Sequence, residues 1–120
     1  MKEISFVILS WNSEKYLKDC IQSILNIEKY NFGIYIVDNG SIDGSVKIIE
    51  AFCDKQIHLI KLEKNYGTTI SRNKGLQLIK HTDYICILDS DTIINEQAIN
   101  VMTEYLEKHN NVRNCRSSYG

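Results

Sequence analysis

The feature that most constrains the fold of this chain is a regular alternation of apolar, β-branched runs with segments of helical periodicity. The apolar runs are ISFVILS, GIYIVD, IHLIKL and YICILD, at residues 4–10, 33–38, 57–62 and 84–89. Segments with apolar residues three and four apart follow them, at about residues 13–27, 43–53, 68–79 and 95–109. Strands that are apolar over most of their length are typical of parallel sheets covered on both faces. The pattern therefore predicts an α/β fold: an open, mostly parallel sheet with helices on both faces.

Individual side chains in the helical segments are assigned from the same periodicity. Ser13 is expected to cap the first helix, because a serine before such a segment can accept a backbone N–H. The apolar residues expected at helical spacing in the third helix are Ile70, Leu76, Leu78 and Ile79. Three aromatic residues at helical spacing are predicted to lie in the core: Tyr16, Phe52 and Tyr105.

Composition argues against several classes of protein. A chain of 120 residues, with 43% hydrophobic and 24% charged residues, has the size and composition of one soluble domain. The net charge of −1 argues against a nucleic-acid-binding surface and against attraction to anionic membranes. No apolar run is long enough to span a bilayer and the N-terminus does not resemble a signal peptide, so we expect no transmembrane segment and a cytoplasmic location.

The cysteines do not form a metal-binding pattern. They lie about thirty residues apart without a C-x-x-C pair, unlike the ligands of a structural zinc site. At least Cys20, Cys53 and Cys86 are expected to be small buried residues of a reduced chain. A disulfide framework is the alternative.

Unusual polar residues follow the predicted strands rather than precede them. After the four strands come, in order, Ser10-Trp11-Asn12, Asp38-Asn39-Gly40-Ser41, a stretch containing Asn65, Gly67, Arg72 and Asn73, and Asp89-Ser90-Asp91. Ligands of open parallel sheets bind beyond the carboxyl ends of the strands, where the strand order reverses. Four loops are therefore expected to converge on one binding edge.

Asp89 and Asp91 admit two interpretations. Aspartate favours turns and helix N-caps, so either residue could simply begin the helix that follows. In an extended segment, however, both side chains point to the same side, and two like charges there need a cation or hydrogen-bond donors between them. A few hard oxygen ligands suit Mg²⁺ or Mn²⁺, with waters and substrate phosphates completing the shell. We favour the metal site over the helix cap.

The remaining candidates are compatible with a nucleotide. Asp38 precedes an Asn39-Gly40 turn expected to supply positive φ, and its carboxylate can accept an N–H from a base or a hydroxyl from a ribose. Arg72 is either a solvent-facing helical arginine or a bidentate ligand of phosphate or a base carbonyl near a helix N-terminus. Trp11 could stack on a base or simply close the first strand.

With these residues in place, the chain resembles the N-terminal half of a family 2 glycosyltransferase, of the inverting GT-A type, over about residues 3–110. The matching motifs are ISFVILSWN, IYIVDNGSIDGSVKIIE, NYGTTISRNKGL and YICILDSDT, in the family's order. Two departures are Leu9, where the family often has proline, and Ser71, where it often has alanine. The resemblance implies a Rossmann-like nucleotide-binding half with glycosyltransferase activity.

The resemblance also implies roles for the candidate residues. Asp38 would contact the base of a nucleotide-sugar donor, most often uracil, and Arg72 would lie near the base or the diphosphate. Asp89 would bind the ribose side, or the metal through water, and Asp91 would coordinate the Mg²⁺ or Mn²⁺ that bridges the diphosphate. The predicted donor-binding residues are Ser10, Trp11, Asn12, Asp38, Asn39, Arg72, Asp89 and Ser90, and the predicted metal ligands are Asp91 and Asp89.

Two parts are expected along the chain: a nucleotide-sugar-binding domain at 1–110, and a polar tail or the start of an acceptor half at 111–120. The catalytic base, which would deprotonate a hydroxyl of an unknown acceptor, is expected in the acceptor half, and no residue here is assigned to it. The alternative function is a truncated nucleotide-binding or assembly module without turnover. A phosphate-accepting receiver domain fits less well, because it needs an acidic pair after the first strand. Self-association through an exposed sheet edge is a further expectation.

Overall fold

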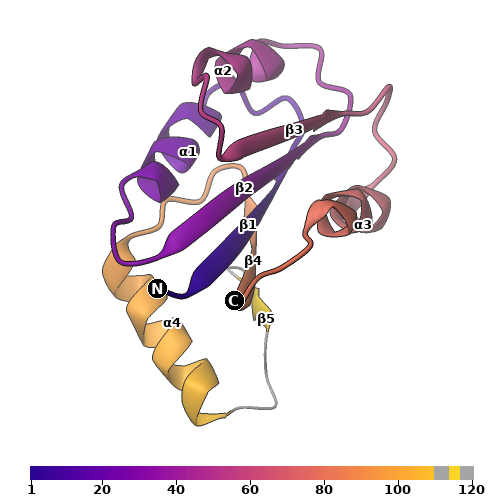
Figure 1. Ribbon diagram of the computed structural model, residues 1–120. Helices are drawn as coiled ribbons and strands as arrows, with labels where there is room; N and C mark the ends of the chain where they lie inside the picture. Colours follow the sequence, from indigo (N-terminus) through magenta and orange to yellow (C-terminus); the bar gives the residue numbers. More distant parts are fainter. Residues whose placement is uncertain (110–113, 117–120) are drawn as a thin grey trace.

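A sheet of parallel strands forms the centre of the molecule, in a computed structural model that describes residues 1–109 and the backbone of 114–116 (Figure 1). The strands are β1 (Glu3–Ser10), β2 (Asn31–Asp38), β3 (Ile57–Lys61), β4 (Tyr84–Asp89) and β5 (Asn114–Arg116). The helices α1 (Leu17–Leu25), α2 (Ser45–Ala51), α3 (Thr68–Leu78) and α4 (Glu96–Lys108) follow the first four strands in turn. The order across the sheet is β3-β2-β1-β4-β5, with every pair parallel. The predicted α/β fold is confirmed.

Helices cover both faces of the sheet, as predicted: α1, α2 and α4 lie on one face and α3 on the other (Figure 1). The main core lies under the three-helix face, because alternate side chains of each strand point to that side. It includes Phe6, Ile8, Ile34 and Ile36 from the strands and Cys20, Ile21, Ile24, Ile49, Ile99 and Leu106 from the helices. None of the helices in the described part of the chain combines the length and apolar character that a bilayer-spanning helix requires.

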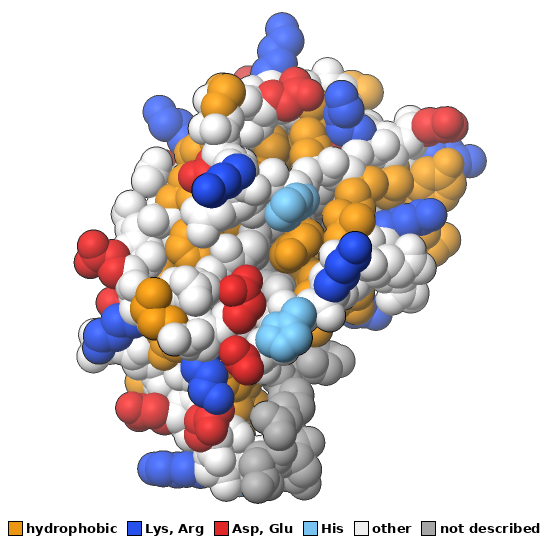
Figure 2. Space-filling view, in the orientation of Figure 1, with side chains coloured by type: hydrophobic (Ala, Val, Ile, Leu, Met, Phe, Trp, Pro, Cys, Tyr) orange, Lys and Arg blue, Asp and Glu red, His pale blue; other side chains and the backbone are white. Residues whose placement is uncertain are grey.

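The α3 helix packs against the sheet through small residues. Its buried residues are Ser71 and Gly75. A Cβ on Gly75 would lie 2.9 Å and 3.2 Å from valine side chains of β1 and β2, so the glycine permits a close approach. Of the four apolar residues expected at helical spacing here, Ile70 and Leu78 are 48% and 42% exposed, whereas Leu76 and Ile79 are half-buried, so the four do not form one buried stripe. Figure 2 shows apolar side chains at the surface on this side of the molecule.

Two predictions about helical side chains are also wrong. The α1 helix begins at Leu17, and Tyr16 holds its N-cap position without a side-chain hydrogen bond, so Ser13 is not the cap. Tyr16 and Tyr105 are 54% and 56% exposed. Of the three aromatic residues expected in the core, Phe52 alone packs against it.

The cysteines divide by position. Cys20 and Cys86 are buried in the core, as predicted. Cys53 is exposed, contrary to the prediction. The α2 helix ends at Ala51, and Cys53 adopts a φ of +50°, so it lies beyond the helix in the loop that precedes β3.

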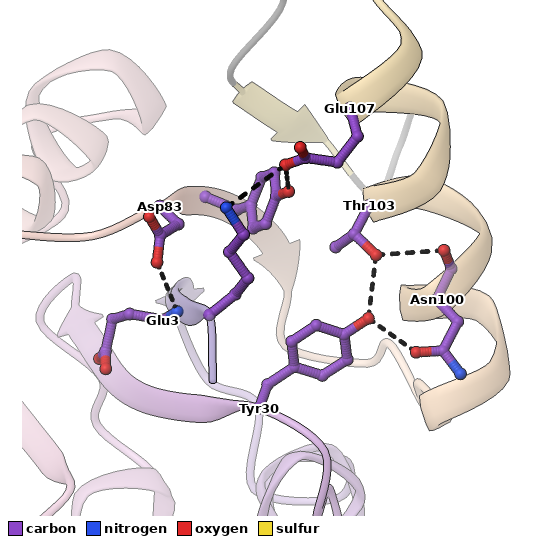
Figure 3. A network of polar contacts seen from close by, with 8 residues as sticks. Glu3, Tyr30, Asp83, Asn100, Thr103 and Glu107 are labelled. Carbon is purple, nitrogen blue, oxygen red and sulfur yellow. Dashed lines mark hydrogen bonds and ion pairs between the residues drawn. The ribbon is translucent and has the colours of Figure 1, made fainter. Parts of the chain in front are cut away.

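Polar contacts hold α4 near the amino ends of the strands (Figure 3). The Tyr30 hydroxyl donates to Asn100 Oδ1 at 2.7 Å and lies 2.9 Å from Thr103 Oγ1. Asp83 accepts the backbone N–H of Glu3 at 2.8 Å, which ties the start of β1 to the start of β4. These contacts stabilise the scaffold at one end of the sheet and leave the opposite end to the loops that follow the strands.

The strand order reverses between β1 and β4, because β2 and β3 lie on one side of β1 while β4 and β5 lie on the other. A ligand site is expected beyond the carboxyl ends of these two strands. Strand β5 falls within the predicted tail at 111–120, and residues 110–113 and 117–120 lie outside the described residues. The division of the chain near residue 110 stays a prediction.

Candidate functional site

The carboxyl ends of β1, β2 and β4 lie side by side at one edge of the sheet. In the strand register Ser10 is opposite Asp38, and Asp89 is opposite the residue before Ser10. The start of α3 joins this edge, because the Asn39 side-chain amide donates to the Gly67 carbonyl at 3.4 Å. We call this edge the rim, and it comprises residues 10–13, 38–45, 65–72 and 89–92. The structure thus brings the four predicted loops together.

Asp38 is a buried carboxylate, with 2% of its surface exposed. Its Oδ1 accepts the hydroxyls of Ser41 at 2.6 Å and Ser10 at 3.2 Å, and its Oδ2 accepts the Ser41 backbone N–H at 2.8 Å. Hydrogen bonds to an ionised acceptor are stronger than neutral ones, so Asp38 firmly joins the end of β1 to the turn after β2. A base N–H would share these oxygens with the serines, and that contact stays a prediction.

The turn after β2 depends on Gly40. This residue has a φ of +79°, and Asn39, which was expected to share the positive φ, does not. A Cβ at Gly40 would lie 2.6 Å from the backbone Cα of Lys64, so no larger side chain fits. Asn39 Oδ1 accepts the Tyr66 N–H at 2.9 Å. The turn therefore holds the β3–α3 loop against the end of β2.

The loop after β1 presents an aromatic ring to solvent. Trp11 is 54% exposed, and a flat exposed ring is a suitable surface for stacking a base. The next residue, Asn12, adopts a φ of +47°, a conformation that asparagine tolerates better than most residues. Its N–H donates to Ser41 Oγ at 2.8 Å and its Oδ1 accepts the Ile42 N–H at 2.9 Å. The loop after β2 thus fixes the backbone beside the Trp11 ring.

The acidic pair at the end of β4 does not cap the next helix. Asn95 caps α4, with its Oδ1 accepting the Ala98 N–H at 2.8 Å, so the helix-cap interpretation is wrong. Asp89 and Asp91 are both exposed, and neither forms an ion pair with any described residue. Burial, and then the nearby Asp91 charge, raise the pKa of the Cys20 thiol to about 12. Among the described residues, the pair is therefore a local concentration of negative charge that no ion pair offsets.

The donor chemistry of this pair fits a hydrated divalent ion. Within residues 1–109, no group of three or more His, Cys, Asp or Glu side chains could hold a metal. Mg²⁺ characteristically binds through one or two carboxylates and keeps waters and phosphate oxygens as its other ligands. Asp89 and Asp91 supply that number of carboxylates, and both are accessible.

Two further predicted residues complete the rim. Ser90 Oγ lies 2.6 Å from Ser13 Oγ, which links the turn after β4 to the loop after β1. Arg72 is half-buried one turn into α3 and forms no ion pair with any described residue. All the predicted site residues therefore lie on the rim, and their contacts with a ligand stay predictions.

A second set of rim residues was missed from the sequence. Ser45 Oγ accepts the Ser13 N–H at 2.8 Å and donates to Asp43 Oδ1 at 2.5 Å. Asp43 also accepts the Glu14 N–H at 3.2 Å, and Glu14 in turn accepts the Gly44 N–H at 2.6 Å. Desolvation raises the pKa of Asp43, but hydrogen bonds from Ser45 and Glu14 outweigh it and lower the pKa overall. The sequence signal that could have indicated these contacts is the SIDGS stretch at residues 41–45, because Ser and Asp side chains readily form hydrogen bonds with nearby backbone groups.

The family model described as glycosyl transferase family 2 matches the chain over residues 5–119. The chain belongs to this family. Among curated proteins, glycosyltransferase GlyG of Streptococcus pneumoniae is 34% identical over 88% of this chain and 35% of GlyG. Teichoic acid poly(glycerol phosphate) polymerase of Staphylococcus epidermidis is 34% identical over 92% of this chain and 15% of the polymerase. The resemblance seen in the motifs is confirmed.

Solved structures agree with the family assignment. The crystal structure of S. aureus TarS 1–349 superposes with a TM-score of 0.76 and 27% identity, covering 92% of this chain and 33% of TarS. The same TarS fragment in complex with UDP-GlcNAc gives the same TM-score and identity. The GT-A fold is therefore confirmed, and this chain spans about a third of the length of GlyG and of the TarS fragment.

Proposed function

We propose that this chain forms the donor-binding part of a glycosyltransferase, which binds a UDP-linked sugar through a divalent metal for transfer to an acceptor. The observation that carries the proposal is the convergence of four loops on the rim. There the exposed Trp11 ring, the Arg72 guanidinium and the two carboxylates of Asp89 and Asp91 lie on neighbouring loops. These groups match the base, the phosphates and the counter-ion of a nucleoside diphosphate. The likeness to TarS, which was crystallised with UDP-GlcNAc, supports a UDP-linked donor.

Each of the predicted rim residues discussed below has a distinct part in this proposal. Trp11 stacks on the base, and the buried turn at Asp38 borders the base or the ribose. Arg72 attracts the diphosphate, because a guanidinium forms paired hydrogen bonds with phosphate oxygens. Asp89 and Asp91 hold Mg²⁺ or Mn²⁺. Such an ion, when bound, neutralises charge on the diphosphate leaving group.

Charge balance supports the metal part of the proposal. A diphosphate is an anion, and Asp89 and Asp91 repel it across an exposed rim. Arg72 supplies one positive charge for the phosphates. It forms no ion pair with Asp89 or Asp91, so the charges of these two carboxylates are not balanced by it. A divalent ion between the carboxylates and the phosphates removes this repulsion. Donor binding should therefore depend on the metal.

The proposal leaves the acceptor and the catalytic base unassigned. No residue of the rim is proposed as the base that deprotonates the acceptor hydroxyl. Transfer and hydrolysis assays with the 120-residue chain distinguish an active transferase from a binding module without turnover.

Trp11 provides a direct test, because it is the single tryptophan of the sequence. Titrations with UDP, GDP and dTDP, with and without Mn²⁺, should change its fluorescence most strongly with UDP and Mn²⁺ together. Calorimetry of the same mixtures gives the affinities. Asp91→Asn should weaken Mn²⁺-dependent UDP binding by about tenfold or more.

Glu104→Gln is the matched control, since it removes one exposed carboxylate from α4, away from the rim. It should leave UDP binding unchanged. The proposal is overturned if UDP does not bind, or if Asp91→Asn and Glu104→Gln bind UDP with the same metal dependence as the original chain.

A further inference from the structure

Ser13 lies where three loops of the rim meet. It is 6% exposed, in the loop between β1 and α1, beside the point where the strand order reverses. The Trp11 N–H donates to Ser13 Oγ at 3.3 Å, and Ser13 Oγ donates back to the Trp11 carbonyl at 3.1 Å. The same oxygen lies 2.6 Å from the Oγ of Ser90, the residue that separates Asp89 and Asp91 in the sequence.

The Ser13 hydroxyl has three hydrogen-bond neighbours: the Trp11 N–H, the Trp11 carbonyl and the Ser90 hydroxyl. A serine hydroxyl has one hydrogen to donate and two lone pairs to accept with. Either hydroxyl can donate in the 2.6 Å bond between the two serines, and when Ser13 gives its hydrogen to the Trp11 carbonyl, Ser90 is the donor. Ser13 Oγ then accepts from both Ser90 and the Trp11 N–H. In either direction, the bond holds Ser90 Oγ at 2.6 Å from Ser13 Oγ.

The backbone of Ser13 is fixed as well. Its N–H donates to Ser45 Oγ at 2.8 Å, and Ser45 is fully buried. Its carbonyl accepts the N–H groups of Tyr16 at 3.0 Å and Leu17 at 3.1 Å. Movement of Ser13 would therefore break its contacts to the start of α1 and to Ser45 at the start of α2. Ser13 is thus a rigid attachment point for Ser90.

The turn that carries the acidic pair has few other attachments. Within it the Thr92 N–H donates to the Asp89 carbonyl at 3.0 Å. Cys20 Sγ lies 3.9 Å from that carbonyl, which is a weak contact. Among the described residues, the hydroxyl of Ser90 therefore makes the strongest side-chain bond between residues 89–91 and the rest of the protein.

We propose that Ser13 is a positioning residue of the donor site: through Ser90 it sets the direction of the Asp89 and Asp91 carboxylates relative to the Trp11 ring. This inference rests on the proposed function of the rim. Ser13 acts through its neighbours, in the way that hydrogen bonds behind a metal ligand orient it. A carboxylate pair held in one direction binds an ion more tightly than one that must be ordered on binding.

The test is Mn²⁺ binding by the 120-residue chain in the presence of UDP, followed through the electron paramagnetic resonance signal of free Mn²⁺. Ser13→Ala should weaken Mn²⁺ binding by about tenfold, the lower end of what losing a supporting hydrogen bond costs a metal site. In a Ser90→Ala background the same substitution should cause no further loss, because the two hydroxyls act as one unit.

Ser23→Ala is the matched control. The Ser23 hydroxyl also links α1 to the segment after β4, since it accepts the Ile94 N–H at 3.2 Å and donates to the Cys20 carbonyl at 2.7 Å. It should lower stability and leave Mn²⁺ affinity unchanged. Circular dichroism establishes that each variant is folded. If Ser13→Ala does not fold, Ser90→Ala alone must weaken Mn²⁺ binding.

The outcomes separate this inference from the proposed function. If the original chain binds Mn²⁺ with UDP and Ser13→Ala binds as tightly, the positioning role is wrong and the donor site stands. Losses that add fully in the double variant, or an equal loss in Ser23→Ala, also overturn it. If the original chain does not bind Mn²⁺ with UDP, the proposed function fails and the inference fails with it.

Discussion

Replacing Asp38 with alanine tests whether this buried carboxylate organises the rim in the absence of any ligand. The change removes the acceptor of three hydrogen bonds, two from Ser41 and one from Ser10. A hydrogen bond to a charged group contributes about 1.5–3 kcal/mol, and a buried donor left unpaired costs about 1–3 kcal/mol. The two hydroxyls can rotate toward other acceptors, but the Ser41 N–H cannot. We therefore expect Asp38→Ala to lower the free energy of unfolding by about 3 kcal/mol.

Asp38→Asn is the milder partner of this substitution. Its carbonyl oxygen can still accept the Ser41 N–H, while the serine hydroxyls rotate to accept from its amide nitrogen. The charge-assisted part of the bonds is lost, so a decrease of about 1 kcal/mol is expected. The original chain should be the most stable, Asp38→Asn less stable, and Asp38→Ala the least stable.

Urea unfolding without nucleotide or metal measures these differences. With a slope of about 1.5 kcal/mol per molar urea, a loss of 3 kcal/mol moves the midpoint down by about 2 M. Circular dichroism follows the whole fold, and Trp11 fluorescence follows the rim. An Asp38→Ala midpoint equal to or above that of the original chain would refute the reasoning, since it would mean that the carboxylate serves a ligand and does not stabilise the loops.

Two further predictions concern stability. Ser71 is buried in α3 and its hydroxyl has no hydrogen-bond partner among the described residues, so Ser71→Ala should raise the free energy of unfolding by about 1 kcal/mol. A lower urea midpoint for this variant would contradict the packing described for α3. The backbone N–H groups of Lys29 and then Glu28 donate to Glu96 and lower its pKa from the ordinary value of 4.5. Near that pH the folded state binds fewer protons than the unfolded state, so this contribution is full above pH 4.5 and is lost as the pH falls through the folded pKa. Glu96→Gln should flatten the acid side of the urea midpoint plotted against pH, and an unchanged slope would show that these bonds do not stabilise α4.

Much of the fold could be predicted because its signals are local. The four apolar runs and the helical spacing between them gave β1 to β4 and α1 to α4, with differences of a few residues at the ends. The α3 helix was the exception in its packing, because a helix that approaches a sheet closely buries small residues. Ser71 and Gly75 carry no hydrophobic signal, whereas Ile70 does and is exposed.

The candidate site was predicted as a set of loops, but its internal structure was not. Parallel strands place their carboxyl ends at one edge, so residues after each strand could be assigned to the rim without coordinates. The contacts among Ser13, Ser45 and Ser90 could not, because they join residues far apart in the chain through hydroxyls that occur in any loop. Ser13 had a plausible local role as a helix cap, and the structure gives its hydroxyl to Trp11 and Ser90 instead.

The sequence by itself determined the succession of strands and helices along the chain, the edge at which polar loops gather and the family to which the chain belongs. These depend on periodicity and on motifs, each of which is contained in a short stretch of residues. The tertiary structure decided which side chains on that edge support the others: Asp38 is enclosed by two serines, whereas Asp89 and Asp91 are exposed and form no ion pair within the described part of the chain. The physical reason is that burial and hydrogen bonding of a carboxylate depend on the register of neighbouring strands. That register is set by packing across the whole sheet.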